Sequence, residues 1–284
     1  GSGCRVALAS TKGKILSTAK SGPANIETSL MDARNNIIEA CCCALEKVSL
    51  DQSTINSTKA VLGLAGSNMG DYDKQLKRLL PFEENVIVND GEITLEGAIG
   101  YTDGCVGAIG TGSVFVGRKN GQAKQIGGWG FLFGDDGSGA KLGKELLRLS
   151  ILCEEKFFAH SNLTTRIMND FNNKIVNIVK IGSDLKPKDF ASYAPLIFDA
   201  YHQKDPNAVK IINNEIKMIE RSLIAVGFNT QLPFCLVGGL GSSYLPLLDI
   251  KFSTIAQPPI NEPLIGAIKM AQRIFSEKST IHQS

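Results

Sequence analysis

The apolar positions along the chain change their spacing several times, and each spacing predicts a different element. Residues 4–9 form a strand-like run, 11–13 offer a turn and 14–18 return, which predicts a β-hairpin. Short apolar runs predict buried strands at 59–64, 86–88, 105–109, 114–118 and 233–237. Three- and four-residue spacing predicts helices at 28–48, 71–80, in most of 141–227 and at 263–275, with another beginning just after Asp90. Strand–helix modules around a helical insert predict an α/β protein with two lobes.

Composition excludes several classes of protein. Lysine plus arginine (30) nearly balance aspartate plus glutamate (28), so no surface for nucleic acid or membrane is expected. No apolar run reaches the roughly 18 residues of a membrane span, and the first residues do not resemble a signal peptide. The seven cysteines include no CxxC pair, which favours reduced thiols in a cytoplasmic protein over a structural metal site.

The first candidate for ligand chemistry is the turn Gly110-Thr111-Gly112-Ser113 between two predicted strands. Its glycines let the backbone approach a charged ligand, and the two hydroxyls add donors, which suits the phosphates of ATP. The turn is not a P-loop, because no Gly-Lys-Ser/Thr follows the glycines. A plain hairpin turn of the same composition is the alternative.

The second candidate is the segment 127–139, which is too rich in glycine for a regular element and holds the single tryptophan, Trp129. Asp135 and Asp136 precede a predicted helix, where carboxylates can simply cap the helix. The functional alternative is that Asp135 bonds sugar hydroxyls while Trp129 shapes the pocket.

Two strand ends complete the set of candidates. Asp90 follows the strand 86–88, at a place where ligand sites gather in α/β sheets, and could accept a proton from a hydroxyl or cap the next helix. Gly238 and Gly239 follow the strand 233–237, and could start a helix or face an adenosine. Phosphoryl transfer needs a positioned hydroxyl, cradled phosphates and Mg²⁺, which Asp90, the 110–113 turn and a bound Mg²⁺ would supply.

Together these segments resemble the sugar-kinase/actin/heat-shock-70 ATPase superfamily, and within it the BadF/BadG-type ATPase family that contains N-acetylglucosamine kinase and bacterial glucosamine kinase. The matching segments follow the family's order: 21–25, 63–66, Asn89-Asp90, 110–113, 127–130, 134–139 and 238–239. The resemblance implies two ribonuclease-H-like domains, 1–98 and 99–284, closing over a cleft, with the helix 262–276 packing back on the first. It also implies a homodimer.

The same resemblance implies an ATP-dependent kinase for the 6-hydroxyl of glucosamine or N-acetylglucosamine, with ATP and Mg²⁺ as cofactors. Asp90 would be the catalytic base. The ATP-binding residues would be Gly110, Thr111, Gly112, Ser113, Gly238 and Gly239. The sugar-binding residues would be Asn25, Trp129, Gly130 and Asp135. No residue is assigned to the metal.

One departure from the family's pattern concerns the beginning of the sequence. Kinases of the family start with a strand that ends in Asp-Gly-Gly-Gly-Thr, whose Asp helps hold the metal, and residues 1–5 align with the tail of this motif. That strand lies in the middle of the first sheet, so we expect unpaired neighbouring strands and an apolar gap without it. We expect the chain as printed to be short by roughly a dozen residues, with 1–3 a possible cloning remnant, and to have little or no kinase activity.

Two other functions use related folds. An ATPase that activates a radical dehydratase resembles this family but holds an iron–sulfur cluster through cysteines, and the cysteine spacing here does not favour one. A non-catalytic sugar-sensing regulator would carry a helix-turn-helix before the first hairpin, for which the sequence has no room, and the balanced charge argues against DNA binding.

Overall fold

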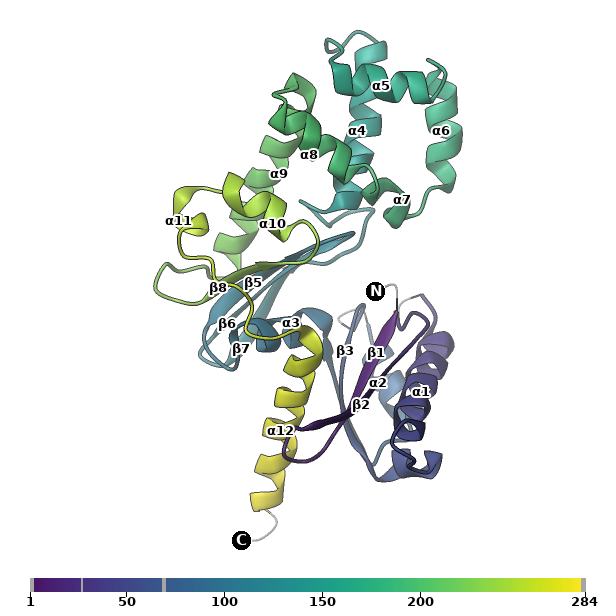
Figure 1. The fold of residues 1–284 in the computed structure, drawn as a ribbon, viewed down its shortest axis with the longest axis vertical. Helices are drawn as coiled ribbons and strands as arrows, with labels where there is room; N and C mark the ends of the chain where they lie inside the picture. Colours follow the sequence, from purple (N-terminus) through teal and green to yellow (C-terminus); the bar gives the residue numbers. More distant parts are fainter. Residues whose placement is uncertain (1–2, 27, 68–69, 282–284) are drawn as a thin grey trace. The chain divides into compact units, whose positions relative to one another are not determined.

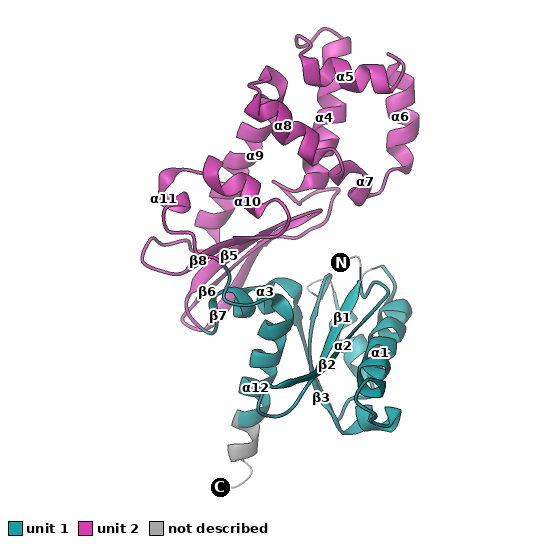
Figure 2. Ribbon diagram, viewed as in Figure 1, with its two compact units in different colours: residues 1–101, 259–284 teal, residues 102–258 magenta. Residues whose placement is uncertain are grey.

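The computed structural model describes residues 3–26, 28–67 and 70–281, and confirms the α/β class (Figure 1). The chain divides into two compact units (Figure 2): unit 1 comprises residues 1–101 and 259–284, and unit 2 comprises residues 102–258. Gly1 and Ser2, which belong to the segment compared with the family's first phosphate loop, lie outside the described residues. Across the described part of the chain, no helix combines the length and apolar character needed to cross a membrane.

Unit 1 holds two separate pairs of strands. Its elements are β1 (Cys4–Ala9), β2 (Ile15–Ser21), α1 (Leu30–Glu46), the 3-10 helix η1 (Gln52–Ser57), β3 (Lys59–Leu64), α2 (Tyr72–Leu79), β4 (Glu84–Asn89), α3 (Asp90–Ile99) and α12 (Pro263–Ile281). β1 pairs with β2 in antiparallel fashion and β3 pairs with β4 in parallel. Among the described residues, no backbone ladder joins the two pairs. The unpaired neighbouring strands expected from the sequence are therefore present.

Helices hold the two pairs of unit 1 in place. Ser29 caps α1 by accepting the Asp32 N–H at 3.2 Å, and α1 buries an apolar stripe that includes Ile37. α12 packs closely on α3: a Cβ atom at Gly266 would collide with the backbone of α3 at Ile93 and Gly97, and a Cβ atom at Gly97 would collide with the Glu262 carbonyl just before α12. The C-terminal helix thus belongs to the same compact unit as the first hundred residues.

Unit 2 joins its strands into one sheet of order β7-β6-β5-β8. Its elements are β5 (Gly104–Ile109), β6 (Ser113–Lys119), β7 (Gln122–Gly127), α4 (Gly139–Glu154), α5 (Asn162–Asp170), α6 (Ile175–Asp184), α7 (Pro187–Ala191), α8 (Ala194–His202), α9 (Pro206–Ala225), β8 (Phe234–Val237), α10 (Gly241–Tyr244), the 3-10 helix η2 (Leu245–Leu247) and α11 (Ile250–Ser253). Only β5 and β8 are parallel to each other.

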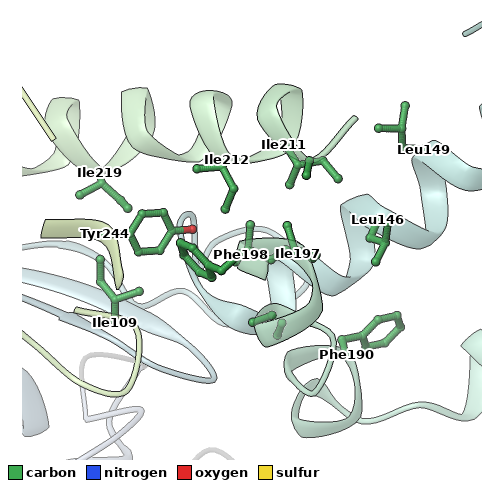
Figure 3. Packing of buried hydrophobic residues seen from close by; sticks show 14 of the residues in the cluster. Ile109, Leu146, Leu149, Phe190, Ile197, Phe198, Ile211, Ile212, Ile219 and Tyr244 are labelled. Atoms are coloured by element: carbon green, nitrogen blue, oxygen red, sulfur yellow. The ribbon is translucent and has the colours of Figure 1, made fainter. Parts of the chain in front are cut away.

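A tight turn joins two neighbouring strands of the unit 2 sheet. Asn120 and Gly121 connect β6 to β7 with positive φ angles of 52° and 75°, as a tight hairpin requires. Helices α4, α8 and α9 bury one continuous apolar cluster, part of which is drawn in Figure 3. The helices of the insert therefore share one hydrophobic core.

Candidate active site

Asp90 is the first residue of α3, directly after β4. The cap of this helix is Asn89, whose side chain accepts the Gly91 N–H at 2.8 Å, while the Glu92 carboxylate accepts the Asn89 N–H at 3.4 Å. The capping alternative for Asp90 is therefore wrong. Its carboxylate stands in the first turn of the helix, partly exposed, at the carboxyl end of a strand.

The Gly110–Ser113 segment is the connection between β5 and β6, so the hairpin-turn description of it is correct as geometry. The turn is also locked onto α4, because the carbonyl oxygens of Gly110 and Thr111 accept the N–H groups of Gly139 at 2.8 Å and Ala140 at 3.2 Å. A turn held at both ends presents its remaining backbone groups in a fixed direction, which is what a phosphate cradle requires.

Asp135 lies at the centre of the glycine segments of unit 2. Its backbone takes a left-handed φ of 61°, and its carboxylate accepts the backbone N–H groups of Ser113 and Gly130. A Cβ atom at Gly112 would stand 2.9 Å from Asp135 Oδ2, so only glycine leaves room for this carboxylate. One side chain thus ties the 110–113 turn to the 127–139 segment.

Burial raises the pKa of the Asp135 carboxyl above its usual value. The N–H donated by Ser113 opposes that shift, the charge of Asp136 adds to it, and the N–H of Gly130 opposes it again. The net direction is upward, so Asp135 takes up a proton at a higher pH than an exposed aspartate.

Neither aspartate caps α4. That role belongs to Ser138, which is fully buried and accepts the Lys141 N–H at 3.1 Å. Asp136 instead accepts the Ser113 hydroxyl proton on its backbone carbonyl at 2.7 Å, and its carboxylate lies 3.9 Å from the Lys141 ammonium. The expectation that the Ser113 hydroxyl is offered to a phosphate is therefore wrong in this conformation, because a hydroxyl has a single proton to donate.

Glu215 on α9 is a residue of the site that the sequence interpretation missed. Its carboxylate accepts the Gly137 N–H at 2.6 Å, across 78 positions of sequence, and its side chain is 5% exposed. Burial raises the pKa of Glu215, and the Gly137 N–H opposes that rise. The available signal was a charged residue on the apolar stripe formed by Ile211, Ile212 and Ile219.

The predicted ATP-binding residues Gly238 and Gly239 lie beside the 110–113 turn. Gly238 has a φ of 90°, and a Cβ atom there would collide with the Ile109 carbonyl, which accepts the Leu240 N–H at 3.0 Å. A Cβ atom at Gly110 would lie 4.0 Å from the Gly239 nitrogen. Because β5 and β8 are parallel, both turns follow the carboxyl ends of strands at one edge of the sheet, where ligands of α/β proteins bind.

The remaining predicted residues divide between the units. Trp129 is 60% exposed and precedes Gly130 in unit 2, in a tight turn closed by the Gly134 N–H donating to the Gly130 carbonyl at 2.8 Å. Asn25 lies in unit 1, in the loop between β2 and α1, and its carbonyl accepts the Ser29 N–H at 3.4 Å. Unit 2 thus gathers every predicted nucleotide residue with Trp129, Gly130 and Asp135, whereas Asn25 and Asp90 belong to unit 1.

The described part of the chain contains no group of three or more metal-binding side chains. Burial raises the pKa of Cys41 and of Cys105 to about 12, so these thiols stay protonated, unlike the thiolates that bind iron or zinc. This agrees with the interpretation of Cys41 and Cys105 as small apolar side chains.

Curated proteins with similar sequences are sugar kinases. The chain is 27% identical to the glucosamine kinase of Vibrio cholerae serotype O1, over 95% of this chain and 92% of that one. It is 26% identical to the N-acetylmuramic acid/N-acetylglucosamine kinase of Clostridium acetobutylicum, over 91% of each chain.

Solved structures agree. A crystal structure of a Chromobacterium violaceum protein assigned as an N-acetylglucosamine kinase superimposes with a TM-score of 0.85, at 25% identity over 95% of both chains. The model of the BadF/BadG/BcrA/BcrD ATPase family matches residues 1–268, nearly the whole sequence. With the glycine turns, Asp90 and Asp135 in the family's order on this fold, the chain belongs to the BadF/BadG/BcrA/BcrD ATPase family.

Proposed function

We propose that this chain is an ATP-dependent amino-sugar kinase that phosphorylates the 6-hydroxyl of glucosamine or N-acetylglucosamine. The observation that carries the proposal is the full-length similarity to two curated kinases, both named for amino sugars or their derivatives. The geometry of unit 2 supports it, because the predicted nucleotide turns and the predicted sugar-binding Asp135 form one connected structure.

In the proposed reaction, Asp90 accepts the proton of the sugar 6-hydroxyl as its oxygen attacks the γ-phosphorus of ATP. The bond from that phosphorus to the bridging oxygen breaks, and ADP leaves with the electron pair. The turns at 110–113 and 238–239 would hold the nucleotide through backbone groups. Asn89 supports this role, since it takes over the capping of α3 and leaves the Asp90 carboxylate for chemistry.

Asp135 would orient the sugar. A carboxylate has about four lone-pair positions, and two backbone N–H groups leave room for sugar hydroxyl protons. The exposed indole of Trp129 would offer an apolar face with a polar edge, and Asn25 would contribute an amide from unit 1.

Mg²⁺ would accompany ATP. This ion typically binds through one or two carboxylates together with substrate phosphates, and does not need a dedicated protein cage. A homodimer is also expected for the working enzyme, and sedimentation would test it.

A coupled ADP-release assay with Mg-ATP tests the proposal, using glucosamine, N-acetylglucosamine, glucose and a control without sugar. Phosphorus NMR of the product identifies the phosphorylated hydroxyl. Asp90→Asn should lower kcat roughly 10²- to 10⁴-fold and leave the KM for ATP nearly unchanged, because it removes the base and no nucleotide contact. Asp199→Asn, at an exposed carboxylate of α8, is the matched control.

Ligand binding is measured separately from turnover. Trp129 is the single tryptophan, so a change in its fluorescence on adding an amino sugar reports directly on the proposed sugar site. A saturable change in fluorescence without turnover would support the proposed sugar site and contradict only the proposed catalysis. ADP release that does not depend on the sugar would instead favour an ATPase activator. The absence of both sugar binding and turnover would contradict the proposal.

A further inference from the structure

Unit 2 contains a pocket between α4 and α9, here named the α4–α9 pocket. Its volume is about 390 Å³, within the roughly 300–1,000 Å³ that is typical of small-molecule sites. Most of its lining residues come from the two helices, including Leu149 of α4 and Ile211 of α9, which are labelled in Figure 3. The residues predicted to bind nucleotide or sugar are not among them, so the pocket is separate from the candidate active site.

The less exposed part of the α4–α9 pocket carries a surplus of negative charge. Glu215 is buried, and Asp136, Lys141 and Glu145 are half-buried. Lys141 is the single cation among these four, and its ammonium lies 3.9 Å from both Asp136 and Glu145. Glu215 has no ion pair with any described residue, and one of its oxygens accepts the Gly137 N–H at 2.6 Å. A carboxylate has about four lone-pair positions, so Glu215 can accept further hydrogen bonds from a cation.

The exposed rim of the pocket carries positive charge. Arg148 of α4 and Lys210 of α9 are both exposed and line the pocket. Arg148 is 3.6 Å from Glu145, a carboxylate that it shares with Lys141. Lys210 has no ion pair within the described part of the chain, and its ammonium lies 3.2 Å from the centroid of the Phe158 ring. The ring holds this ammonium at the rim without neutralising its charge, so an anion can bind there.

The distance between the two charged ends limits the ligand. Lys210 and Glu215 are five residues apart on α9, which corresponds to roughly 7.5 Å along the helix axis. An α-amino acid carries both of its charges on one carbon and cannot reach both side chains. A hexosamine 6-phosphate carries its ammonium on C2 and its phosphate on C6, at opposite sides of the sugar ring, so it can reach both. Asn214 of the same helix lines the pocket and offers an amide to the ring hydroxyls.

We propose that the α4–α9 pocket binds a small zwitterion, a hexosamine 6-phosphate with a free amine, through Glu215 at its ammonium and through Lys210 and Arg148 at its phosphate. Such a compound is the product of the proposed reaction with glucosamine. Its assignment as the enzyme's own product therefore rests on the proposed function, whereas its binding does not. Because Glu215 also accepts the Gly137 N–H, the pocket adjoins the segment that presents Asp135.

Isothermal titration calorimetry without nucleotide tests the proposal on the whole chain. Glucosamine 6-phosphate, which carries both charges, should bind saturably. Glucose 6-phosphate replaces the ammonium with a hydroxyl and glucosamine lacks the phosphate, so each should bind to this pocket at least about tenfold more weakly. Amide exchange adds the location, since glucosamine 6-phosphate should slow exchange in α4 and α9 and leave β6 unchanged.

Two protein variants assign the binding to the pocket. Lys210→Gln removes the positive charge at the rim and should weaken the binding of glucosamine 6-phosphate at least about tenfold. Lys217→Gln makes the same change at an exposed position of α9 that does not line the pocket. It should leave the affinity within about twofold, because a distant surface charge is screened by salt. Circular dichroism checks that both variants fold. If Lys210→Gln does not fold, the comparison with glucose 6-phosphate still decides the outcome on the unaltered chain.

Several results would overturn the proposal. One is the absence of saturable binding, and another is equal affinity for glucose 6-phosphate, which would contradict the role of Glu215. Binding that Lys210→Gln leaves unchanged would place the ligand elsewhere, such as in the candidate active site. The outcome is distinguishable from that of the proposed function. Binding in the pocket without sugar-dependent turnover would contradict the kinase alone, and sugar-dependent turnover without this binding would contradict the pocket alone.

Discussion

Each unit contributes four strands from its described residues, and the two units use them differently. In unit 2 every strand is hydrogen-bonded to a neighbour in one sheet, because β8 returns parallel to β5 after the helical insert. In unit 1 the four strands form two pairs, and a groove lined by every residue of β1 and β3, here named the strand groove, lies between the two pairs. Unit 2 is held together by backbone ladders as well as by its core. Unit 1 relies on the packing of α1, α3 and α12 across the interruption.

The candidate chemistry follows the same division. Unit 2 carries turns whose backbone is fixed by several hydrogen bonds, from Gly139 to Gly110 and from Ser113 to Asp135 and Asp136. Unit 1 carries Asp90 at the start of α3, where Asn89 caps the helix and the Thr94 hydroxyl donates to the Asp90 carbonyl at 2.8 Å, and Asp90 also lines the groove. Most of the proposed binding residues thus belong to unit 2, whereas the proposed base Asp90 belongs to unit 1 together with Asn25.

The largest expected effect separates binding from chemistry. Asp135→Asn should weaken amino-sugar binding about tenfold to a hundredfold, because a hydrogen bond to a charged group contributes about 1.5–3 kcal/mol. Asp90→Asn should leave that affinity within about threefold, since its role is proton transfer. Titration of Trp129 fluorescence measures both. Equal losses in the two variants would contradict the division of roles.

The pH dependence of sugar binding sharpens this prediction. Burial raises the pKa of Asp135 above the usual 3.8, so on acidification its carboxylate is protonated earlier than an exposed one. Affinity should therefore be complete at neutral pH and fall as the pH drops through that raised pKa, because the protonated group accepts fewer hydrogen bonds. In Asp135→Asn this fall in affinity at acidic pH, the acidic limb of the binding curve, should disappear. Its persistence would assign the limb to another group.

The next effect compares the two sheets through one kind of substitution. Val106 in the central strand β5 is 2% exposed, whereas Val61 of β3 is half-buried and lines the strand groove. Val106→Ala should cost about 2 kcal/mol, since it removes two methyl groups from a closed core, and Val61→Ala should cost less than about 1 kcal/mol. Urea unfolding measures both, with Trp129 fluorescence for unit 2 and amide exchange of β4 for unit 1. Equal costs would mean that the groove is closed in solution.

A smaller effect tests how α9 supports the sugar site. Glu215→Ala leaves the Gly137 N–H without its acceptor and should weaken amino-sugar binding about tenfold, or about 1.4 kcal/mol, by loosening the turn that presents Asp135. Glu215→Gln keeps an acceptor oxygen and should restore affinity to within about threefold. Trp129 fluorescence provides the readout. Equal losses in the alanine and glutamine variants would instead assign the effect to the charge.

Local patterns predicted most of the elements, because strand and helix periods are properties of a few neighbouring residues. The strand 59–64 was placed at its observed bounds, and the interruption of the first sheet was also expected. Where two neighbouring residues cap equally well, the pattern could not choose. Asn89 caps α3 beside Asp90, and Ser138 caps α4 close to Asp136.

The missed contacts join residues far apart in sequence. The bond from Gly137 to Glu215 spans 78 positions, and the Ser113 hydroxyl donates to a carbonyl 23 positions away. Neither contact produces a periodic pattern in the sequence, because tertiary packing decides which helix covers which turn. Sequence reasoning could name the glycine turns of the site, but not the carboxylate and the carbonyl that hold them.

The smallest predicted effect concerns the closed core of unit 2, which is not fully satisfied. Tyr244 is wholly buried beneath α9, its ring edge-on to Phe198 at 5.1 Å (Figure 3). Its hydroxyl makes no hydrogen bond to any described residue. Burial, and then the charge of Glu215, hold the pKa of this phenol well above 10, so it stays neutral.

Tyr244→Phe should therefore leave unit 2 equally stable or stabilise it by up to about 1 kcal/mol, since it removes a buried polar group without a partner and keeps the ring. Urea unfolding followed by Trp129 fluorescence measures the change, and Tyr201→Phe at a half-buried position of α8 is the control, expected to be neutral. If Tyr244→Phe destabilises unit 2 by more than about 0.5 kcal/mol, the hydroxyl has a partner in solution. In that case the buried Tyr244 hydroxyl of unit 2 would be hydrogen-bonded, and unit 2 would differ from unit 1 in its core as well as in its continuous sheet.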